Sequence, residues 1–279
     1  MSNSMQFHTR GLDIVHHFTE GPKVKEPHFH NFYEFIYIIQ GKAEVTVNNR
    51  VYQAGPHSLL AISNLEKHHW RTLEIPYERY CIVFKPEYFN SAIKDPVLSS
   101  VFRNRPDYFS HLLQLSVEDN AKLFSLLNQM REEMTPEKAY WEVNLRSLFR
   151  LFIVSLYRSY SDFFPIPTLN KTDALVLEIQ KYLENNCQND INLQDVAKEH
   201  FIDMYYLSHL FKKVTGFSFK EYLILQRISK AKDLLFYTME DITEVGMSAG
   251  FNNINHFIRI FKKYEGVTPY QYRKKIKSS

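Results

Sequence analysis

Residues 211–222 read FKKVTGFSFKEY, and residues 261–272, fifty positions later, read FKKYEGVTPYQY. Five of the twelve positions are identical, among them the Phe-Lys-Lys start and the glycine. After that glycine each copy carries a possible capping box, in which a hydroxyl and a carboxylate or amide satisfy free backbone donors at a helix start. These pairs are Ser218 with Glu221 and Thr268 with Gln271. A repeat with matched helix ends and helix starts predicts one structural unit used twice.

A helix-turn-helix pattern precedes the first copy. Apolar residues at helical spacing predict one helix over about 192–201 and a second over 204–214, with Asp203 as a candidate N-cap between them. The residues of the first helix that are expected to face inward are Leu193, Val196, Ala197 and Phe201.

The same pattern precedes the second copy. Asp241 is a candidate N-cap, Gly250 suits a tight turn that needs positive φ, and a helix is expected over 254–264. Gly246 is small enough for two helices to cross closely there. A linking helix is expected at about 219–237, so the sequence predicts two tandem helix-turn-helix units joined by one rigid element.

Positive charge is concentrated in the same region. The whole chain has a net charge of +3, but residues 205–277 hold 13 Lys and Arg against six Asp and Glu. Residues 1–170 hold 18 of each and are neutral. The excess therefore lies on and after the first candidate recognition helix, where a polyphosphate partner needs it. This placement favours nucleic-acid binding over a helical protein-interaction module.

Residues 172–277 resemble the DNA-binding domain of the AraC/XylS family of transcription regulators. The matching residues are Val196, Ala197, Tyr206 to Ser208, Leu210 to Lys213, Gly216, Tyr222, Leu223, Arg227, Ala231, Leu234, Leu235, Ile242 to Val245, Gly250, Phe251, Phe257, Arg259, Phe261 to Lys263, Gly266, Thr268, Pro269, Tyr272 and Arg273. The sequence departs from the family pattern at three positions. Gly246 replaces the usual alanine, which predicts some loss of helix stability. His209 stands where arginine is common, and Ile258 stands at an often polar position.

The resemblance implies that the second helix of each unit enters a major groove of double-stranded DNA, in two grooves about one turn apart. The candidate base-contacting residues are Tyr205, Ser208, His209 and Lys212 in the first unit and Asn255, Arg259 and Lys262 in the second. Arg259 suits guanine and Asn255 suits adenine. Residues expected to contact phosphates, which position a domain without selecting sequence, are Lys213, Arg227, Lys263 and Arg273.

Length and composition restrict the remaining possibilities. A chain of 279 residues predicts two domains. Its two cysteines, Cys81 and Cys187, fall in different predicted domains, which argues against a disulfide framework and fits a reducing compartment. The most apolar stretch, 148–157, is interrupted by Arg150 and is too short to cross a bilayer. We expect a cytoplasmic protein without a membrane partner.

The N-terminal half has a β pattern. Residues 5–110 alternate apolar and polar positions between turn signals, which is typical of a small barrel or sandwich. Strands are expected at 35–39, 44–47, 51–52, 59–62 and 80–84, with turns at Gln40-Gly41 and at Asn48-Asn49-Arg50.

Spaced histidines in this half resemble the cupin motifs. Gly21, His28, His30, Glu34 and Gly41 match the first motif, and Gly55 with His68 thirteen residues later loosely matches the second. In metal-binding cupins the residues matching the three histidines and the glutamate hold the ion, a set that suits a borderline divalent metal. Regulators of the AraC/XylS family, by contrast, commonly use a cupin-like pocket for a small effector, often a sugar, without metal.

Three interpretations of this cluster are open: a metal site, the polar lining of an effector pocket, and structural histidines paired with Glu34. His28 and His30 are expected on one face of a strand, which serves either a metal or a ligand. We favour an effector pocket formed by His28, His30, Glu34, His68 and Trp70. Imidazoles, a carboxylate and an aromatic face suit a carbohydrate. No metal, cofactor or catalytic residue is expected.

The middle of the chain is predicted to be helical over about 117–160, and the family resemblance implies that part of this surface pairs two chains into a homodimer. The expected domains are an effector and dimerisation domain at 1–160, a proline-stiffened linker at 161–171 and a DNA-binding domain at 172–279. The predicted fold class is α+β, a cupin-like β-barrel with flanking helices followed by an all-α domain of two helix-turn-helix units.

We therefore interpret the chain as a transcription regulator, not an enzyme, which binds specific DNA in response to a small molecule such as a sugar. If it is an activator, RNA polymerase is a further expected partner. The alternative is a metal-dependent cupin enzyme fused to a DNA-binding module. The metal content of the purified protein, and its loss on His28→Ala, would separate the two.

Overall fold

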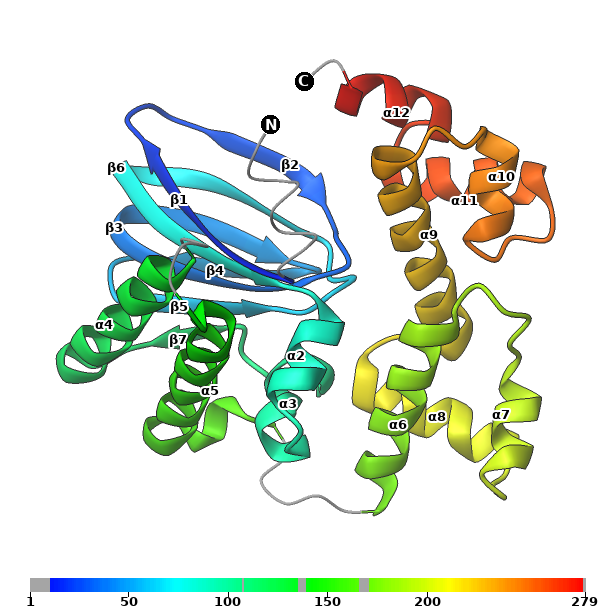
Figure 1. The fold of residues 1–279 in the computed structure, drawn as a ribbon, viewed down its shortest axis with the longest axis horizontal. Helices are drawn as coiled ribbons and strands as arrows, with labels where there is room; N and C mark the ends of the chain where they lie inside the picture. The colour runs from blue at the N-terminus through cyan, green and yellow to red at the C-terminus, as the bar shows by residue number, and fades with distance from the viewer. Residues whose placement is uncertain (1–10, 107, 135–138, 166–170, 278–279) are drawn as a thin grey trace. The chain divides into compact units, whose positions relative to one another are not determined.

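The computed structural model describes residues 11–106, 108–134, 139–165 and 171–277. The chain divides into two compact units, Met1–Asn170 and Lys171–Ser279, which are considered separately (Figure 1). None of the helices in the described ranges combines the length and the apolarity that crossing a bilayer requires.

A seven-stranded antiparallel sheet forms the N-terminal unit. Its strands are β1 (Leu12–Thr19), β2 (Val24–His28), β3 (Tyr33–Val47), β4 (Arg50–Ala54), β5 (Ser58–Ile62), β6 (His68–Phe84) and β7 (Leu112–Gln114). The order is β1-β6-β3-β5-β7, with β2 added on β6 and β4 added on β3. Strands β3 and β6 pair along most of their length. On its other side, β3 pairs first with β5 and then with β4. Likewise β6 pairs first with β2 and then with β1. Among the described residues β1 and β7 do not pair, so the cupin-like barrel is open.

Strand β3 differs from the expectation of two short strands around a turn. It runs unbroken from Tyr33 to Val47, with register shifts between Ile38 and Ala43. Gly41 lies in this irregular stretch with φ of 74°, and a Cβ there would collide with the carbonyl oxygens of Pro76 and Glu74 on β6. The glycine therefore marks a bulge in a continuous strand rather than a turn. The expected hairpin at Asn48-Asn49 is present, with Val47 paired to Arg50.

The first half of β3 is buried on both faces and separates two cores. Tyr33, Phe35 and Tyr37 pack against the helices of the unit. Ile36 and Ile38 belong to the second core, on the opposite face of the strand, as the alternation of side chains along a strand requires. The helices are α2 (Pro86–Ala92), α3 (Pro96–Arg103), α4 (Val117–Glu133) and α5 (Trp141–Ser159).

The segment expected to begin the linker belongs in part to this unit. Ser161–Phe163 forms a 3-10 helix, η1, and Phe163 and Phe164 are buried in the core beneath α5. Two aromatic side chains held in a core cannot act as a free connection, so residues 161–164 extend the domain. Residues 166–170 of the expected linker lie outside the described residues.

Helices alone form the C-terminal unit. They are α6 (Lys171–Asn186), α7 (Leu193–Glu199), α8 (Met204–Thr215), α9 (Phe219–Tyr237), α10 (Ile242–Ser248), α11 (Ile254–Glu265) and α12 (Pro269–Lys277). The capping pattern agrees with the sequence except at Ser218, which accepts from the N–H of Glu221 at 3.3 Å without a return bond from the Glu221 side chain among the described residues. Asp241 and Glu244 form a complete capping box, and Thr268 and Gln271 exchange both capping hydrogen bonds, at 3.0 and 3.3 Å. The linking helix α9 spans the predicted residues.

Candidate functional sites

The two helix-turn-helix units present recognition helices of equal length. Asp203 caps the start of α8, where its carboxylate accepts from the backbone N–H of Tyr206 at 2.9 Å. Asn253 caps the start of α11, where its side-chain oxygen accepts from the N–H of His256 at 2.9 Å. Each helix has 12 residues and ends at a glycine C-cap. The sequence repeat therefore corresponds to two equivalent helices with defined starts and ends.

On α8, most of the predicted base-contacting side chains are exposed. Tyr205 is 70% exposed, His209 and Lys212 are exposed, and Ser208 is half-buried. The His209 ring is held by a hydrogen bond between Nδ1 and the carbonyl oxygen of Tyr205, at 2.9 Å. When Nδ1 carries the proton that this carbonyl accepts, Nε2 is the nitrogen left for an outside partner.

On α11 the outward face is polar and the inward face is aromatic. Asn255, Arg259 and Lys262 are exposed, while Phe257 and Phe261 are fully buried. In the described ranges the side chains of Asn255 and Arg259 make no hydrogen bond or ion pair, so their amide and guanidinium groups are available to an external partner.

Two arginines expected to contact phosphates are engaged inside the domain. Arg227 of α9 donates to the carbonyl oxygens of Cys187 at 2.7 Å and Asn189 at 2.8 Å, just beyond the end of α6. Arg273 of α12 donates to the carbonyl oxygen of Glu240 at 2.5 Å. Both side chains satisfy backbone carbonyls at helix ends or in loops, where donors would otherwise be missing. The exposed lysines of the predicted phosphate set are Lys213 and Lys263.

The turns of the two units use different residues at the same backbone position. Gly250 has φ of 96° and is buried, as the sequence led us to expect for a tight turn. Phe201 occupies the corresponding place with φ of 55°. Its expected inward position is wrong, since α7 ends at Glu199 and the ring is 95% exposed.

Gly246 lies at a close crossing of two helices, as its small size led us to expect. A Cβ at this position would lie 2.8 Å from Cδ1 and 3.2 Å from Cγ of Phe257 on α11. The missing side chain allows α10 and α11 to approach closely, so the glycine has a packing role that offsets its low helix propensity.

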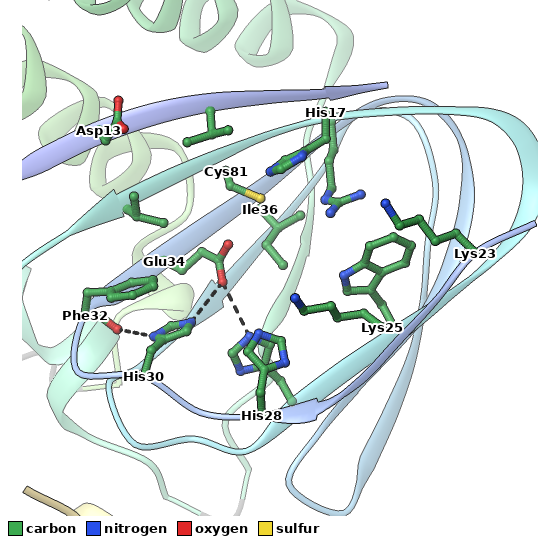
Figure 2. A pocket seen from close by; sticks show the side chains of 15 residues that line it. Asp13, His17, Lys23, Lys25, His28, His30, Phe32, Glu34, Ile36 and Cys81 are labelled. Carbon is green, nitrogen blue, oxygen red and sulfur yellow. Dashed lines mark hydrogen bonds and ion pairs between the residues drawn. The ribbon is translucent and has the colours of Figure 1, made fainter. Parts of the chain in front are cut away.

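A pocket of about 420 Å³ opens in the sheet of the N-terminal unit (Figure 2). Its lining comes mainly from β1, β2, β3 and β6 and includes Asp13, Val15, His17, Lys23, Lys25, His28, His30, Phe32, Glu34, Ile36, His68, Trp70, Arg79, Cys81 and Val83. All five residues predicted for an effector site therefore line one cavity. Its volume is within the range of small-molecule sites.

Three histidine rings and one carboxylate meet in this pocket. Oε2 of Glu34 lies 3.4 Å from Nε2 of His30 and 3.6 Å from Nε2 of His68. The His28 and His68 ring centroids are 4.3 Å apart. His28 ends β2 and His30 lies in the following loop, so they do not share one regular strand as expected. The loop nevertheless turns His30 toward Glu34 (Figure 2).

Burial sets the charges of these groups. Burial and the adjacent His68 lower the pKa of His28 to about 3. Burial and His30 lower the pKa of His68 to about 4, so both rings are neutral near pH 7. Burial alone would raise the pKa of Glu34, but the hydrogen bond and charge of His30 outweigh it and lower the pKa to about 2. Burial and Glu34 raise the pKa of the Cys81 thiol, which stays protonated.

Sequence reasoning missed the cationic side of the pocket. The guanidinium of Arg79 stacks 4.1 Å from the centroid of the Trp70 ring, and Lys23 and Lys25 also line the cavity. Arg79 is 6% exposed, and its Nε and Nη1 atoms are buried without a hydrogen-bond partner among the described residues. Only the last five residues of β6 were recognised as a strand. Reading the alternation back from Tyr80 would have placed Arg79 in the sheet, but not in the pocket.

Comparison with known proteins agrees with both units. A model of the AraC-like ligand-binding domain matches residues 12–153, and a model of a helix-turn-helix domain matches residues 196–275. The Msm operon regulatory protein of Streptococcus mutans is 24% identical over 268 residues, covering 93% of this chain and 88% of that protein. The transcriptional activator RhaR of Mannheimia succiniciproducens is 21% identical over 252 residues, covering 88% and 86%.

A solved structure of ToxT from Vibrio cholerae has the same fold, with a TM-score of 0.60 at 16% identity over 94% of this chain and 97% of that one. The ligand-binding-domain match alone covers half of the chain, and the relatives are regulators rather than enzymes. The chain belongs to the AraC family of transcription regulators, with a ligand-binding domain followed by a DNA-binding domain of two helix-turn-helix units.

Proposed function

We propose that this regulator binds its operator with α8 and α11 in successive major grooves and that a small molecule in the N-terminal pocket controls transcription. The observation that carries the DNA-binding proposal is the exposed polar face of α11, where Asn255 and Arg259 have no intramolecular partner in the described part of the chain. Arg259 would contact guanine and Asn255 adenine. On α8, Tyr205, Ser208, His209 and Lys212 would take the equivalent positions, and Lys262 would support α11.

Phosphate contacts would come mainly from exposed lysines. Lys213 and Lys263 follow the buried phenylalanine of each recognition helix at matching positions of the repeat. Arg227 and Arg273 would instead support these helices from within, because their guanidinium groups already donate to carbonyl oxygens.

The dependence of operator affinity on salt tests this proposal. Each phosphate that the protein neutralises contributes roughly 0.9 to the slope of log affinity against log salt concentration. Several lysine contacts should therefore give a steep negative slope between low and physiological salt. A slope near zero would contradict DNA binding by these surfaces.

For the effector, we propose a carbohydrate, and among carbohydrates one that carries a carboxylate. Glu34 can accept from two hydroxyl groups, and Trp70 lines the cavity with an aromatic ring. The Nε and Nη1 atoms of Arg79 favour an anionic group, since buried N–H groups of a cation without a hydrogen-bond acceptor are costly and an anionic ligand would supply one.

A matched pair of sugars, galactose and galacturonate, tests the effector proposal within a wider carbohydrate panel. Binding should raise the melting temperature of the N-terminal unit only, and the acid should raise it more. Glu34→Ala should abolish the shift, whereas Arg259→Ala, on the DNA-binding unit, should leave it unchanged. DNA binding without effector should survive Glu34→Ala. A shift that persists in Glu34→Ala would place the ligand elsewhere.

We further propose a homodimer that pairs through α5. Val143 and Leu151 are exposed and lie eight positions apart on this helix, a spacing that falls within one broad apolar stripe. Leu151→Glu should convert a dimer to a monomer in sedimentation experiments, while Glu142→Gln on the same helix should not. A wild-type protein that sediments as a monomer would reject this interface. An activator of this type would also contact RNA polymerase.

A further inference from the structure

The imidazole of His209 is oriented by its own helix. Its Nδ1 atom lies 2.9 Å from the carbonyl oxygen of Tyr205, one turn earlier on α8. A carbonyl oxygen only accepts hydrogen bonds, so Nδ1 carries the proton, and in the neutral ring the lone pair is then on Nε2. His209 is exposed, and its Nε2 has no hydrogen-bond partner among the described residues. This lone pair is therefore available to a partner outside the protein.

The ring also lies on the part of α8 that would meet DNA bases. In helix-turn-helix proteins the N-terminal residues of the recognition helix contact base edges. His209 is the sixth residue of α8, and helical side chains lean toward the N-terminus of their helix. The bond to Tyr205, the second residue, holds the ring in this direction. The fixed lone pair is therefore presented where a base would lie.

The second unit presents the opposite chemistry at the same position of the repeat. Arg259 follows His209 by fifty residues, which is the offset of the repeat. Its guanidinium has five N–H donors and no acceptor. In the major groove guanine offers two acceptors, O6 and N7, whereas adenine and cytosine each carry an amino group that donates. An acceptor on α8 and donors on α11 therefore suit different bases.

We propose that His209 selects a base with an exocyclic amino group, accepting through Nε2 from N6 of adenine or N4 of cytosine. The inference rests on the proposed function, in which α8 lies in a major groove. The polar groups that guanine and thymine present there are acceptors, so either base would leave the lone pair of Nε2 facing another acceptor. The two DNA segments that one chain contacts then differ in sequence, although the units that contact them are repeats.

Binding-site selection with the full-length protein tests the inference, at about pH 8, where free imidazole is neutral. The wild type should select adenine or cytosine at one position, and His209→Arg should select guanine there instead. Lys213→Ala, on the same helix, is the matched control and should weaken binding to all sequences about equally. Selection of guanine or thymine by the wild type at the position that His209→Arg changes, or a preference that this substitution leaves unchanged everywhere, would overturn the inference.

Removal of the amino group alone gives a sharper test. Unsubstituted purine in place of the selected adenine, or pyrimidin-2-one in place of the selected cytosine, lacks that group. The wild type should lose affinity roughly threefold to tenfold, the usual net effect of one hydrogen bond. His209→Ala should lose less, because only the altered base pair itself then contributes.

Equal losses in the wild type and in His209→Ala would overturn the inference. A wild-type protein that prefers no DNA sequence would reject the proposed function as well. One that selects bases only through α11 would reject the role of His209 and keep the proposed function of the second unit.

Discussion

The two helix-turn-helix units share a backbone but differ in how their turns are held. In the second unit the turn is buried, and a Cβ on Gly250 would lie 2.7 Å from both the carbonyl oxygen of Cys187 and Cα of Gln188. In the first unit Phe201 takes the same left-handed conformation with its ring in solvent. The repeat therefore conserves local geometry, while packing against the rest of the domain decides which residue each turn can accept.

The largest expected effect is that of Gly250→Ala. Left-handed backbone costs a non-glycine residue about 1 kcal/mol or more. Overpacking against backbone atoms that cannot rotate away adds about 1–3 kcal/mol. We expect the free energy of unfolding of the C-terminal unit to fall by about 3 kcal/mol in total, measured by calorimetry of the full chain.

Gly266→Ala is the matched control, because Gly266 has φ of 75° and a Cβ added there would have no atom of the described residues within 4 Å. It should lose only the conformational part, about 1 kcal/mol. Equal losses at both positions would show that the buried turn contributes nothing beyond its backbone conformation.

Arg259→Ala tests whether the second unit contacts DNA bases through α11. Loss of a bidentate arginine contact should weaken operator binding by about 1–3 kcal/mol and relax the preference at one base pair. Lys263→Ala, also on α11, should weaken binding to all sequences about equally. Binding-site selection with each variant measures both effects. Unchanged affinity and preference in Arg259→Ala would exclude this register for the second unit.

Gly246→Ala tests whether close helix crossing outweighs helix propensity. Alanine should add about 1 kcal/mol through propensity, while displacement of the Phe257 ring should cost about 1–3 kcal/mol. We expect a net loss of about 1 kcal/mol in urea unfolding. The first unit already has Ala197 at this place, so a net gain in Gly246→Ala would mean that both units tolerate the same spacing.

The smallest expected effect is a gain in stability from Phe201→Gly. Relief of the left-handed strain contributes about 1 kcal/mol, and the greater freedom of glycine in the unfolded chain removes about half of it. The melting temperature of the C-terminal unit should rise by about 3 °C. Phe201→Ala keeps the Cβ and should give no such rise; if it does, the exposed ring rather than the backbone is the source.

The sequence was most informative where the signals are local. Helix caps such as Asp203 and Asp241, the span of α9 and the turn at Gly250 follow from neighbouring residues, and the structure agrees. Contacts between distant segments could not be predicted from the sequence. No local pattern shows that the Arg227 guanidinium meets carbonyls near Cys187, or that Phe257 fills the space beside Gly246.

The candidate pocket shows the same division. Motif spacing identified His28, His30, Glu34 and His68 because the resemblance carries them together. Arg79 was missed because it lies nine residues from Trp70 along the same strand, β6, and no local pattern shows that the two side chains stack. The turn predicted at Gly41 was wrong for a related reason. A glycine in a bulge and a glycine in a turn give the same sequence signal until the partner strand is known.

Helix α9 has a geometric consequence for the operator. Its 19 residues form a rod of about 28 Å at about 1.5 Å per residue, and Arg227 fastens its middle to the loop after α6. A rod of this length cannot adjust to variable spacing in the duplex, whose helical repeat is about 34 Å. If α8 and α11 bind successive major grooves as proposed, α9 fixes the distance between the two contacted DNA segments. Inserting five base pairs between these segments would then turn the second one to the opposite side of the DNA, beyond the reach of α11, even with every contacted base left unchanged.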